Sequence, residues 1–241
     1  MADILKIATV NINGIKATGR MRMLHDFIQK LLQEVTHQDF AIIQRYDAFL
    51  NVGTNRRGTG ILARQQIPLS NIKRIPSGRG IAAQLRDAWL VNIYAPAGTA
   101  KRTEREEFFN TEIAYLIRTL PPTMILGGDF NCVLSREDCM GAPHFSRALD
   151  LLVRSFDLQD AWSQTTNNTG YTHYTQNGAA RLDRIYMSPN LRLKKTGIET
   201  VFAAFTDHQA VVVRIALDVP MIRLGKGRWM MNERLMEDET F

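Results

Sequence analysis

The sequence has few cysteines and no long hydrophobic segment, and both absences narrow the class of protein. Only two of its 241 residues are cysteine, Cys132 and Cys139, which are too few for a disulfide framework. We therefore expect a reducing compartment and no metal site built on this pair. No apolar run reaches the ~18 residues of a membrane span, so we expect no membrane association. The first ten residues have no basic segment followed by an apolar one, which predicts no secretory signal.

Low-complexity segments are also lacking. Hydrophobic residues make up 45% and charged residues 22% of the chain, as in a globular protein. The net charge is +6 and the isoelectric point about 9.5. Two interpretations stay open here: a mildly basic surface without a partner, or a surface that binds an anionic partner, most commonly nucleic acid.

Short apolar stretches and turn signals alternate along most of the chain, which predicts many strands and few helices. Strands are expected at 4–10, 47–52, 58–64, 80–85, 88–94, from 123, at 198–205 and at 210–217. Helices are expected at 20–32, 103–118 and 146–156. Thr103 is the expected N-cap of the second helix, with Glu106 in the capping-box position. This pattern predicts an α/β fold of two stacked sheets flanked by helices.

Two further features concern the second half of the chain. Asn177-Gly178 is a turn signal between two β-prone stretches, 170–175 and 181–187, and predicts a hairpin. Beyond Pro220 the sequence becomes charged and rich in methionine. We therefore expect one domain over 1–218 and a linker over 219–241 that leads toward a following domain.

Polar residues of catalytic type stand where predicted strands end, and α/β proteins build their sites at such ends. They are Asn11, Tyr94, Asp129, Asn131, Asp183, Asp207 and His208. Each alone has a structural explanation that is at least as good, such as a turn former or a residue at the core's edge. For Asp183 the alternative is an ion pair with Arg181 or Arg184. Their joint occurrence favours a site.

The stretch ILGGDFNCVL, at 125–134, illustrates the signal, because a carboxylate within an apolar strand is costly unless it has a task. The two-residue period of a strand places Asp129 and Asn131 on one face. Asp129 would take a proton from water while Asn131 fixes that water or a phosphate. Gly127 and Gly128 are expected to keep side chains away from the phosphate.

A histidine beside these groups completes a site for phosphodiester hydrolysis. His208 would donate to a phosphoryl oxygen, provided that a carboxylate orients it and keeps it charged, and Asp183 is the candidate. Mg²⁺, which prefers a few hard oxygen ligands, would neutralise charge on the phosphate.

Several motifs in a fixed order resemble the exonuclease-endonuclease-phosphatase superfamily, the fold of the abasic-site endonucleases and of DNase I. They are TVNINGI, LQEVT, NIYAP, GGDFN, RLDRIY and TDH, and the resemblance runs from about residue 4 to 217. The motifs are most similar to the endonuclease domain of non-LTR (LINE-type) retrotransposons. The end of the chain, GKGRWMMNERLMED, is similar to the connector that leads from this domain toward a reverse transcriptase.

The resemblance implies a DNase I-like four-layer sandwich and a set of roles. Two mainly antiparallel sheets would pack face to face between helices. Glu34 would be the chief ligand of Mg²⁺, or alternatively Mn²⁺, with Asn11 supporting it and Asp207 beside the metal. Tyr94 would touch the scissile phosphate. The products would carry a 3′-hydroxyl and a 5′-phosphate.

The remaining implied roles concern the water and the phosphorane. Asp129 would activate the attacking water and Asn131 would position it. His208, oriented by Asp183, would stabilise the phosphorane.

One segment departs from the family pattern, because residues 31–34 follow the first helix with almost nothing between them. A turn and a five-residue strand need roughly seven residues. Either the chain carries a deletion there, or it was altered, or residues 39–43 form the strand and bring Gln44 near the metal. We expect Glu34 to hold the metal because LQEVT matches as a unit.

Two basic clusters and one hairpin are candidates for contact with DNA. The residues are Arg56, Arg57, Lys101, Arg102, Arg105, Tyr171, His173 and Asn177. Basic side chains would make binding fall with salt. A solvated basic face is the equally good alternative. The 171–180 hairpin would enter a groove and set the choice of target.

Four functions remain for comparison with the structure. The first is an endonuclease that nicks double-stranded DNA in the nucleus, in one chain with a reverse transcriptase that uses the 3′-hydroxyl as primer. The second is a repair endonuclease at abasic sites, and the third a phosphatase on a small phosphoester. The fourth is a binding module that has lost its activity.

Overall fold

Two sheets form the framework of the protein in a computed structural model that describes residues 4–12, 22–24, 27, 46–53, 58–162, 170–176 and 178–216. The larger sheet has the strand order β4-β5-β6-β7-β11-β8. Its strands are β4 (Ser70–Arg74), β5 (Gly80–Leu85), β6 (Ala88–Tyr94), β7 (Met124–Asp129), β8 (Gln159–Asp160) and β11 (Asp183–Met187). β6 and β7 are parallel, and the other neighbours are antiparallel.

The facing layer consists of two antiparallel groups of strands. One group has the order β1-β13-β12, and the other pairs β2 with β3. Their bounds are β1 (Ile4–Thr9), β2 (Tyr46–Val52), β3 (Gly58–Arg64), β12 (Lys195–Val201) and β13 (Ala210–Ala216). Ile125 and Ile185 of the larger sheet pack with Val211 and Val213 of β13, so an apolar core separates the two layers.

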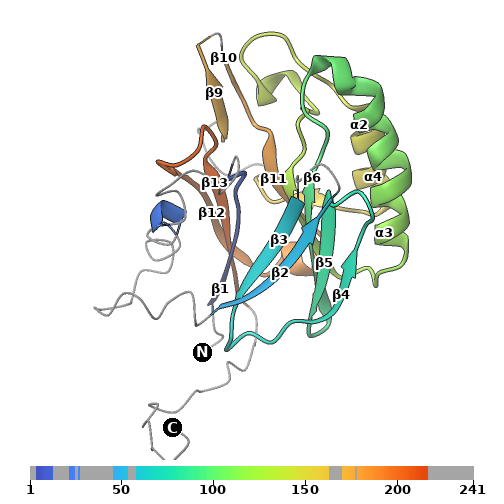
Figure 1. Cartoon of the computed structure of the whole chain (residues 1–241), viewed down its shortest axis with the longest axis vertical. Coiled ribbons are helices and arrows are strands. Elements are labelled where there is room, and N and C mark those ends of the chain that lie inside the picture. The colour runs from blue at the N-terminus through green and yellow to red at the C-terminus, as the bar shows by residue number, and fades with distance from the viewer. Residues whose placement is uncertain are drawn as a thin grey trace, which may run out of the picture.

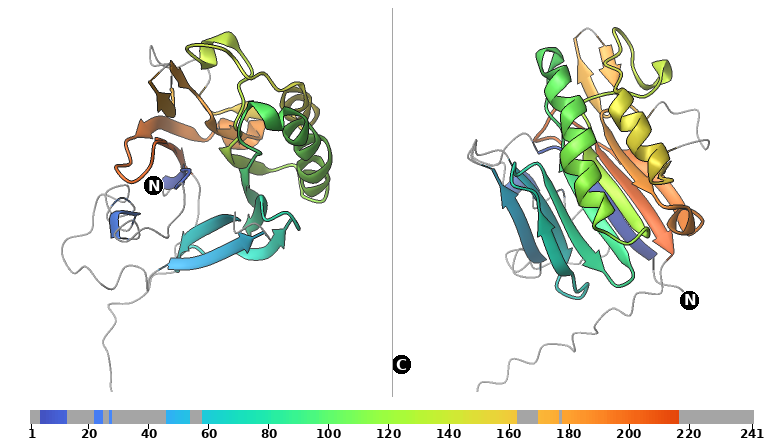
Figure 2. Two further views of the ribbon diagram at one scale, coloured as in Figure 1. Left: turned by 45° about the horizontal axis from the view of Figure 1, so that its top comes forward. Right: turned by 90° about the vertical axis from the view of Figure 1, so that its right-hand side faces the viewer.

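Helices cover the outer face of the larger sheet, as Figures 1 and 2 show. They are α2 (Arg102–Phe108), the π-helical η3 (Phe109–Ile113), α3 (Ala114–Arg118) and α4 (Arg147–Ser155). Phe109, Ile113 and Leu149 are fully buried against that sheet. On the far side, Leu24 and Phe27 pack with Phe205. The expected fold class, two stacked sheets flanked by helices, is confirmed.

Short elements complete the chain. They are η2 (Thr99–Lys101), η4 (Arg136–Asp138), α5 (Pro189–Arg192) and a separate two-stranded hairpin of β9 (His173–Thr175) and β10 (Gly178–Ala180). In the ranges that the structure describes, no helix is both long and apolar enough to cross a membrane.

The expected strands at 58–64, 80–85 and 88–94 match β3, β5 and β6, whereas β4 was not predicted. The predicted hairpin exists, but its second strand is β10 at 178–180, because residues 183–187 pair with β7 and β8 instead. Of the helix predicted at 20–32, residues 22–24 and 27 are described and helical. The proposed linker 219–241 lies outside the described residues.

The predicted N-cap of the long helix is wrong. α2 begins at Arg102, one residue before Thr103, directly after the η2 turn, and no side chain caps it. The side chain of Glu106 does cap a helix, but a different one, because its Oε2 accepts a hydrogen bond from the Ala148 N–H in the first turn of α4. Glu106 therefore joins two helices of the outer layer.

The two glycines of β7 face neighbouring strands and do not line the pocket, which corrects the expectation that they clear space for a phosphate. Gly128 has φ +144°, and a Cβ there would lie 2.1 Å from the carbonyl oxygen of Ile93 in β6. A Cβ on Gly127 would touch Thr9 and Ile185 at ordinary distances of 3.6 Å. The absence of a side chain at Gly128 lets β7 approach β6 closely.

Candidate active site

Strand register brings three of the expected residues to one edge of the larger sheet. Asp129, the last residue of β7, pairs in the parallel direction with Tyr94, the last residue of β6. In the antiparallel direction Asp129 pairs with Asp183, the first residue of β11. Because these three strands are neighbours, residues separated by 35 and 54 positions become adjacent.

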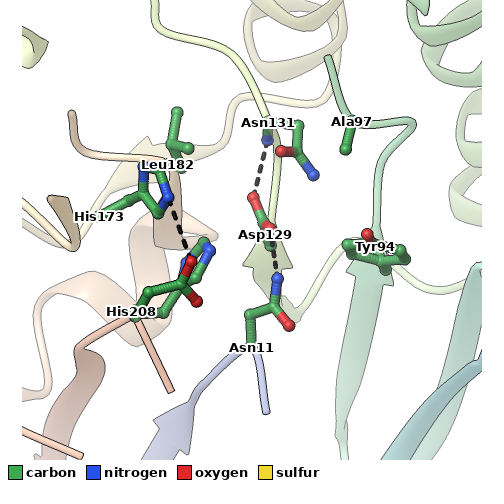
Figure 3. Close-up of a pocket in the computed structure, with 9 residues that line it drawn as sticks. Asn11, Tyr94, Ala97, Asp129, Asn131, His173, Leu182 and His208 are labelled. Atoms are coloured by element: carbon green, nitrogen blue, oxygen red, sulfur yellow. Dashed lines mark hydrogen bonds and ion pairs between the residues drawn. The ribbon is translucent and has the colours of Figure 1, made fainter. Parts of the chain in front are cut away.

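The facing layer adds the other residues. Asn11 follows β1 and His208 precedes β13, and these strands are paired. A pocket of about 280 Å³ forms where the two layers open (Figure 3). It is lined by Asn11, Tyr94, Ala97, Asp129, Asn131, His173, Leu182, Asp207 and His208. The expected catalytic residues therefore converge on one pocket, with Asp183 bonded to His208 beside it.

Asp129 is a buried carboxylate held from two sides. Its side chain accepts hydrogen bonds from Asn11 Nδ2 at 2.8 Å and from the Asn131 backbone N–H at 2.9 Å. Burial and the neighbouring charge of Asp183 raise the pKa of Asp129 to about 7, although His208 and the two hydrogen bonds oppose the rise. A carboxylate with such a pKa can accept a proton near neutral pH.

Asn131 and Tyr94 line the side of the pocket that lies across from His208 (Figure 3). Asn131 has φ +50°, a left-handed conformation that asparagine tolerates better than most residues. Its Nδ2 donates to the carbonyl oxygen of Ala95 at 3.0 Å, which fixes the amide. Arg79 lies 5.3 Å from the centre of the Tyr94 ring and donates to the Tyr94 carbonyl oxygen, so a cation stands behind the tyrosine.

His208 and Asp183 form a buried hydrogen-bonded pair. His208 Nδ1 lies 2.7 Å from Asp183 Oδ2, and both side chains are at least nine-tenths buried. Burial disfavours a charged imidazole, but the Asp183 hydrogen bond and the charges of Asp183, Asp129 and Asp207 outweigh it and raise the pKa of His208. The alternative partners of Asp183 are excluded, because Arg181 and Arg184 pair with Asp138.

Thr172 supports this pair, although no sequence pattern predicted that role. The Thr172 hydroxyl accepts hydrogen bonds from the backbone N–H groups of Leu182 and Asp183, and the Thr172 carbonyl accepts from Gln209 N–H. Thr172 is fully buried. It therefore holds the backbone next to both Asp183 and His208, and a single threonine in a short polar stretch has no sequence signature for that role.

His173, which we expect to contact DNA, lines the pocket itself. Its ring centre lies 4.7 Å from that of His208, and its Nε2 lies 3.6 Å from Asp207 Oδ2. A bridge between the backbones of His173 and His208 fixes this arrangement. The hairpin that begins at His173 is thus joined directly to the pocket (Figures 1 and 3).

The donors around the pocket suit a divalent cation. Because Asn11 Nδ2 donates to Asp129, the Asn11 amide oxygen is the atom that a cation would use. Asp207 is half-exposed, and hydrogen bonds and the nearby imidazoles lower its pKa although burial alone would raise it. Among the residues that the structure describes, Asp183 Oδ1 is buried and has no hydrogen-bond partner. Glu34, the expected chief ligand, lies outside the described residues.

The expected DNA contacts divide into three groups. Lys101 is half-buried and Arg102 is exposed, and both follow the loop that contains Ala97. Tyr171 is half-buried, and His173 lines the pocket. Arg56, Arg57 and Asn177 lie outside the described residues. Arg105 requires a correction, because it is 1% exposed and donates to the carbonyl oxygens of Pro96 and Gly98. It holds the loop after β6 and cannot reach a DNA backbone.

Sequence comparisons relate the chain to a family of nucleases and phosphatases and to a transposon protein. A sequence model of the Endonuclease/Exonuclease/phosphatase family matches residues 8–208. A Xenopus laevis protein described as "Transposon TX1 uncharacterized 149 kDa protein" is 27% identical in an alignment 270 positions long, gaps included, that covers 98% of this chain. The chain spans about 20% of the length of that relative.

Solved structures share the fold at 18% identity. An AP endonuclease from Archaeoglobus fulgidus has a TM-score of 0.70, with 88% of this chain and 100% of that chain covered. A 3′-5′ exonuclease from Neisseria meningitidis has a TM-score of 0.69 and coverage of 88% and 99%. A Neisseria 3′ phosphatase bound to a product DNA hairpin has a TM-score of 0.67 and coverage of 87% and 98%.

Proposed function

The chain belongs to the endonuclease/exonuclease/phosphatase family, an enzyme family of metal-dependent nucleases and phosphoesterases, and from this premise we propose that it is an Mg²⁺-dependent DNA endonuclease of a LINE-type retrotransposon. It nicks one strand of target DNA in the nucleus and leaves a 3′-hydroxyl. A reverse transcriptase in the same full-length protein then extends that end. The similarity to a transposon protein five times as long supports this assignment.

The observation that carries the proposal is the convergence of Asp129, Asn131 and the His208–Asp183 pair on one pocket. With a pKa raised to about 7, Asp129 takes a proton from the attacking water. The Asn131 amide, fixed by Ala95, positions that water. The His208 imidazolium, kept charged and oriented by Asp183, donates to a phosphoryl oxygen as negative charge builds up on it.

A cation and the tyrosine complete the proposed site. Asn11 and Asp207 would hold the divalent ion, together with Glu34 on the strength of the motif resemblance. When bound, the ion supplies charge neutralisation at the phosphate. Tyr94, at the end of β6, would contact the phosphate on the opposite wall.

DNA as the substrate rests on charge and on the relatives. The chain carries a net charge of +6. Lys101 and the exposed Arg102 come shortly after Ala97, which lines the pocket. The solved relatives are described as an AP endonuclease, an exonuclease and a phosphatase bound to a DNA hairpin. These observations favour DNA over a small phosphoester.

A supercoiled-plasmid nicking assay in Mg²⁺ tests the proposal. We expect Asp129→Ala and His208→Ala each to lower the nicking rate by about 10²–10⁴-fold, the usual contribution of a general acid or base. Asp150→Ala and His144→Ala are matched controls outside the pocket and should nick like the wild type. Equal nicking by all five proteins would contradict the mechanism.

The nature of the ends tests the link to reverse transcription. A polymerase should extend the nicked plasmid directly, without prior phosphatase treatment, because the product carries a 3′-hydroxyl. Ends that must be dephosphorylated before extension would contradict the proposed role as a primer.

A second function is favoured by one finding, the shared fold with an AP endonuclease. Nicking rates on an intact duplex and on the same duplex with one abasic site separate the two functions. Comparable rates support the retrotransposon function. Cleavage confined to the abasic duplex would assign the chain to repair instead.

A further inference from the structure

We propose that His173, Asp207 and His208 form a second cation site, selective for Zn²⁺ and similar nitrogen-preferring divalent ions, and that its occupation inhibits the nuclease. The site goes beyond the proposed function, which needs a hard, oxygen-preferring cation at Asn11 and Asp207. It arises because the hairpin places a second imidazole beside His208.

The three side chains already have nearly the spacing of a tetrahedral site. One ligand atom from each of His173, Asp207 and His208 lies within 4.8 Å of the other two. His173 Nε2 and Asp207 Oδ2 are 3.6 Å apart. Ligands at about 2.0–2.1 Å from a tetrahedral Zn²⁺ lie roughly 3.4 Å from each other, so small rotations of His208 and its neighbours suffice.

The outer shell of the site is also in place. Metal-binding histidines nearly always direct their second ring nitrogen to a carboxylate or carbonyl, which fixes the ring and increases its basicity. His208 Nδ1 is 2.7 Å from Asp183 Oδ2, so Nε2 is the nitrogen that can reach an ion. A buried histidine–carboxylate pair of this kind serves a metal ligand as well as a catalytic acid.

The backbone holds the two imidazoles together. A bridge joins His173 to His208, and the Gln209 N–H donates to the Thr172 carbonyl at 2.7 Å. The two rings are tilted by 43° to each other, with their centres 4.7 Å apart. The site therefore needs no folding step when the ion binds, which favours affinity.

The donor set decides which ions bind. Two imidazoles and one carboxylate suit Zn²⁺, Cu²⁺ and Ni²⁺, whereas Mg²⁺ prefers oxygen ligands and loses its water reluctantly. Mn²⁺ stands lowest in the general affinity order of first-row divalent ions. Zn²⁺ should therefore bind tightly in an excess of Mg²⁺, and Mn²⁺ should compete only weakly.

Inhibition follows from the shared ligands. An ion on His208 Nε2 occupies the nitrogen that would donate to the phosphoryl oxygen. It also draws Asp207 away from the cation that supports hydrolysis. Zn²⁺ would thus block the reaction although the fold and the pocket remain intact.

Isothermal titration calorimetry with ZnCl₂ in saturating Mg²⁺ tests binding without reference to activity. We expect one ion per wild-type chain and at least about tenfold weaker binding by His173→Phe, which keeps a ring of similar size. His144→Phe, which changes an exposed histidine outside the pocket, should bind like the wild type. Equal affinity of the wild type and His173→Phe would overturn the proposal, as would the absence of binding by the wild type.

Two further measurements protect the test against a folding defect and against failure of the nuclease proposal. His173→Gln should show the same loss of affinity, and circular dichroism in metal-free buffer verifies that both variants fold. The Zn²⁺ concentration that halves nicking, with each protein normalised to its own metal-free rate, should rise at least about tenfold in His173→Phe. Binding without inhibition would overturn the overlap with His208. An inactive wild type that still binds Zn²⁺ would refute only the nuclease function.

Discussion

Two charged clusters lie on opposite faces of one strand, and they differ in how completely their charges are compensated. Asp183 and Arg184 are adjacent in β11, so their side chains point to opposite faces. Asp183 lies on the pocket side of the strand, and in the described part of the chain its Oδ1 has no hydrogen-bond partner. Arg184 faces the helical layer, where it donates to Asp138, to the Arg181 carbonyl and to the Tyr186 hydroxyl.

Burial raises the pKa of the carboxylates in both clusters, but the net pKa shifts have opposite signs. Burial and Asp183 raise the pKa of Asp129 in the pocket. Burial acts on Asp138 as well, but Arg184 and Arg181 overcome it and hold the pKa of Asp138 below its usual value. The compensated cluster stabilises the loop before α4, whereas the pocket cluster keeps groups that can still take up or give away a proton.

Removal of the charge of Asp183 should have the largest effect on activity. We expect Asp183→Asn to lower kcat by about 10²–10⁴-fold, because His208 loses the partner that keeps it charged and oriented. The pKa of His208 should fall, so the alkaline limb of the pH–rate profile should move to lower pH. Plasmid nicking measured across pH detects both effects. A lower kcat with an unmoved alkaline limb would indicate that Asp183 has only a structural role.

Removal of the charge of Asp138 should instead have the largest effect on stability. Asp138→Ala leaves the buried Arg184 without a carboxylate partner, whereas Arg181 keeps its pair with Asp160, and breaking a buried pair costs about 3–5 kcal/mol. Urea denaturation measures the loss in the free energy of unfolding. The variant molecules that are folded should still nick DNA. Asp150→Ala is the matched control, because its exposed pair with Arg154 contributes about 0.3–0.5 kcal/mol. Losses of equal size in both variants would show that the Asp138 cluster is not a stabilising centre.

The contrast between the two clusters also predicts that Asp129, the proposed general base, lowers the stability of the folded protein when it is ionised. Since the pKa of Asp129 is raised on folding, the folded state binds more protons than the unfolded state between pH 3.8 and about 7. Stability contributed by this group therefore falls as pH rises through that window. At pH 8 the free energy of unfolding of Asp129→Asn should be about 1–3 kcal/mol higher than that of the wild type, although the variant loses activity.

The pH dependence supplies the control for this prediction. The difference in unfolding free energy between Asp129→Asn and the wild type should shrink toward pH 4, because the Asp129 carboxyl is then protonated in the folded state and close to its pKa of 3.8 in the unfolded state. Urea titrations at several pH values measure it. A variant less stable than the wild type at pH 8 would show that hydrogen bonding to Asn11 and Asn131 outweighs the cost of burial.

Much of this arrangement could be predicted from the sequence, because apolar β-prone stretches with clear ends predict where strands end. Asp129 and His208 follow or precede apolar β-prone runs, and the order of motifs placed them in one site. The order of motifs also identified Asp183 as the partner of His208, which the structure confirms. The pairing of Asp138 with two arginines was not predicted, because it depends on tertiary contacts that no local pattern marks.

The failures of prediction have a common physical cause. Arg105 reads as a surface cation on an amphipathic helix, yet carbonyl groups of the preceding loop bury it. Glu106 fits a capping box locally, yet its carboxylate caps a helix 42 residues away. Gly128 was predicted to leave space for a ligand, yet the backbone of β6 occupies that space. In each case a tertiary contact overrides a local signal.

The smallest predicted effect extends the comparison to the two arginines of α2. Arg102 is exposed beyond the pocket rim, whereas Arg105, one turn later, is already bound to carbonyl groups. Arg102→Ala should weaken duplex binding severalfold and reduce the slope of log affinity against log salt by about 0.9, the value for one phosphate contact. Fluorescence anisotropy with a labelled duplex at several salt concentrations measures the slope. Arg118→Ala, at the exposed far end of α3, is the matched control and should leave the slope unchanged, so an equal change in both variants would reduce Arg102 to part of a general basic surface.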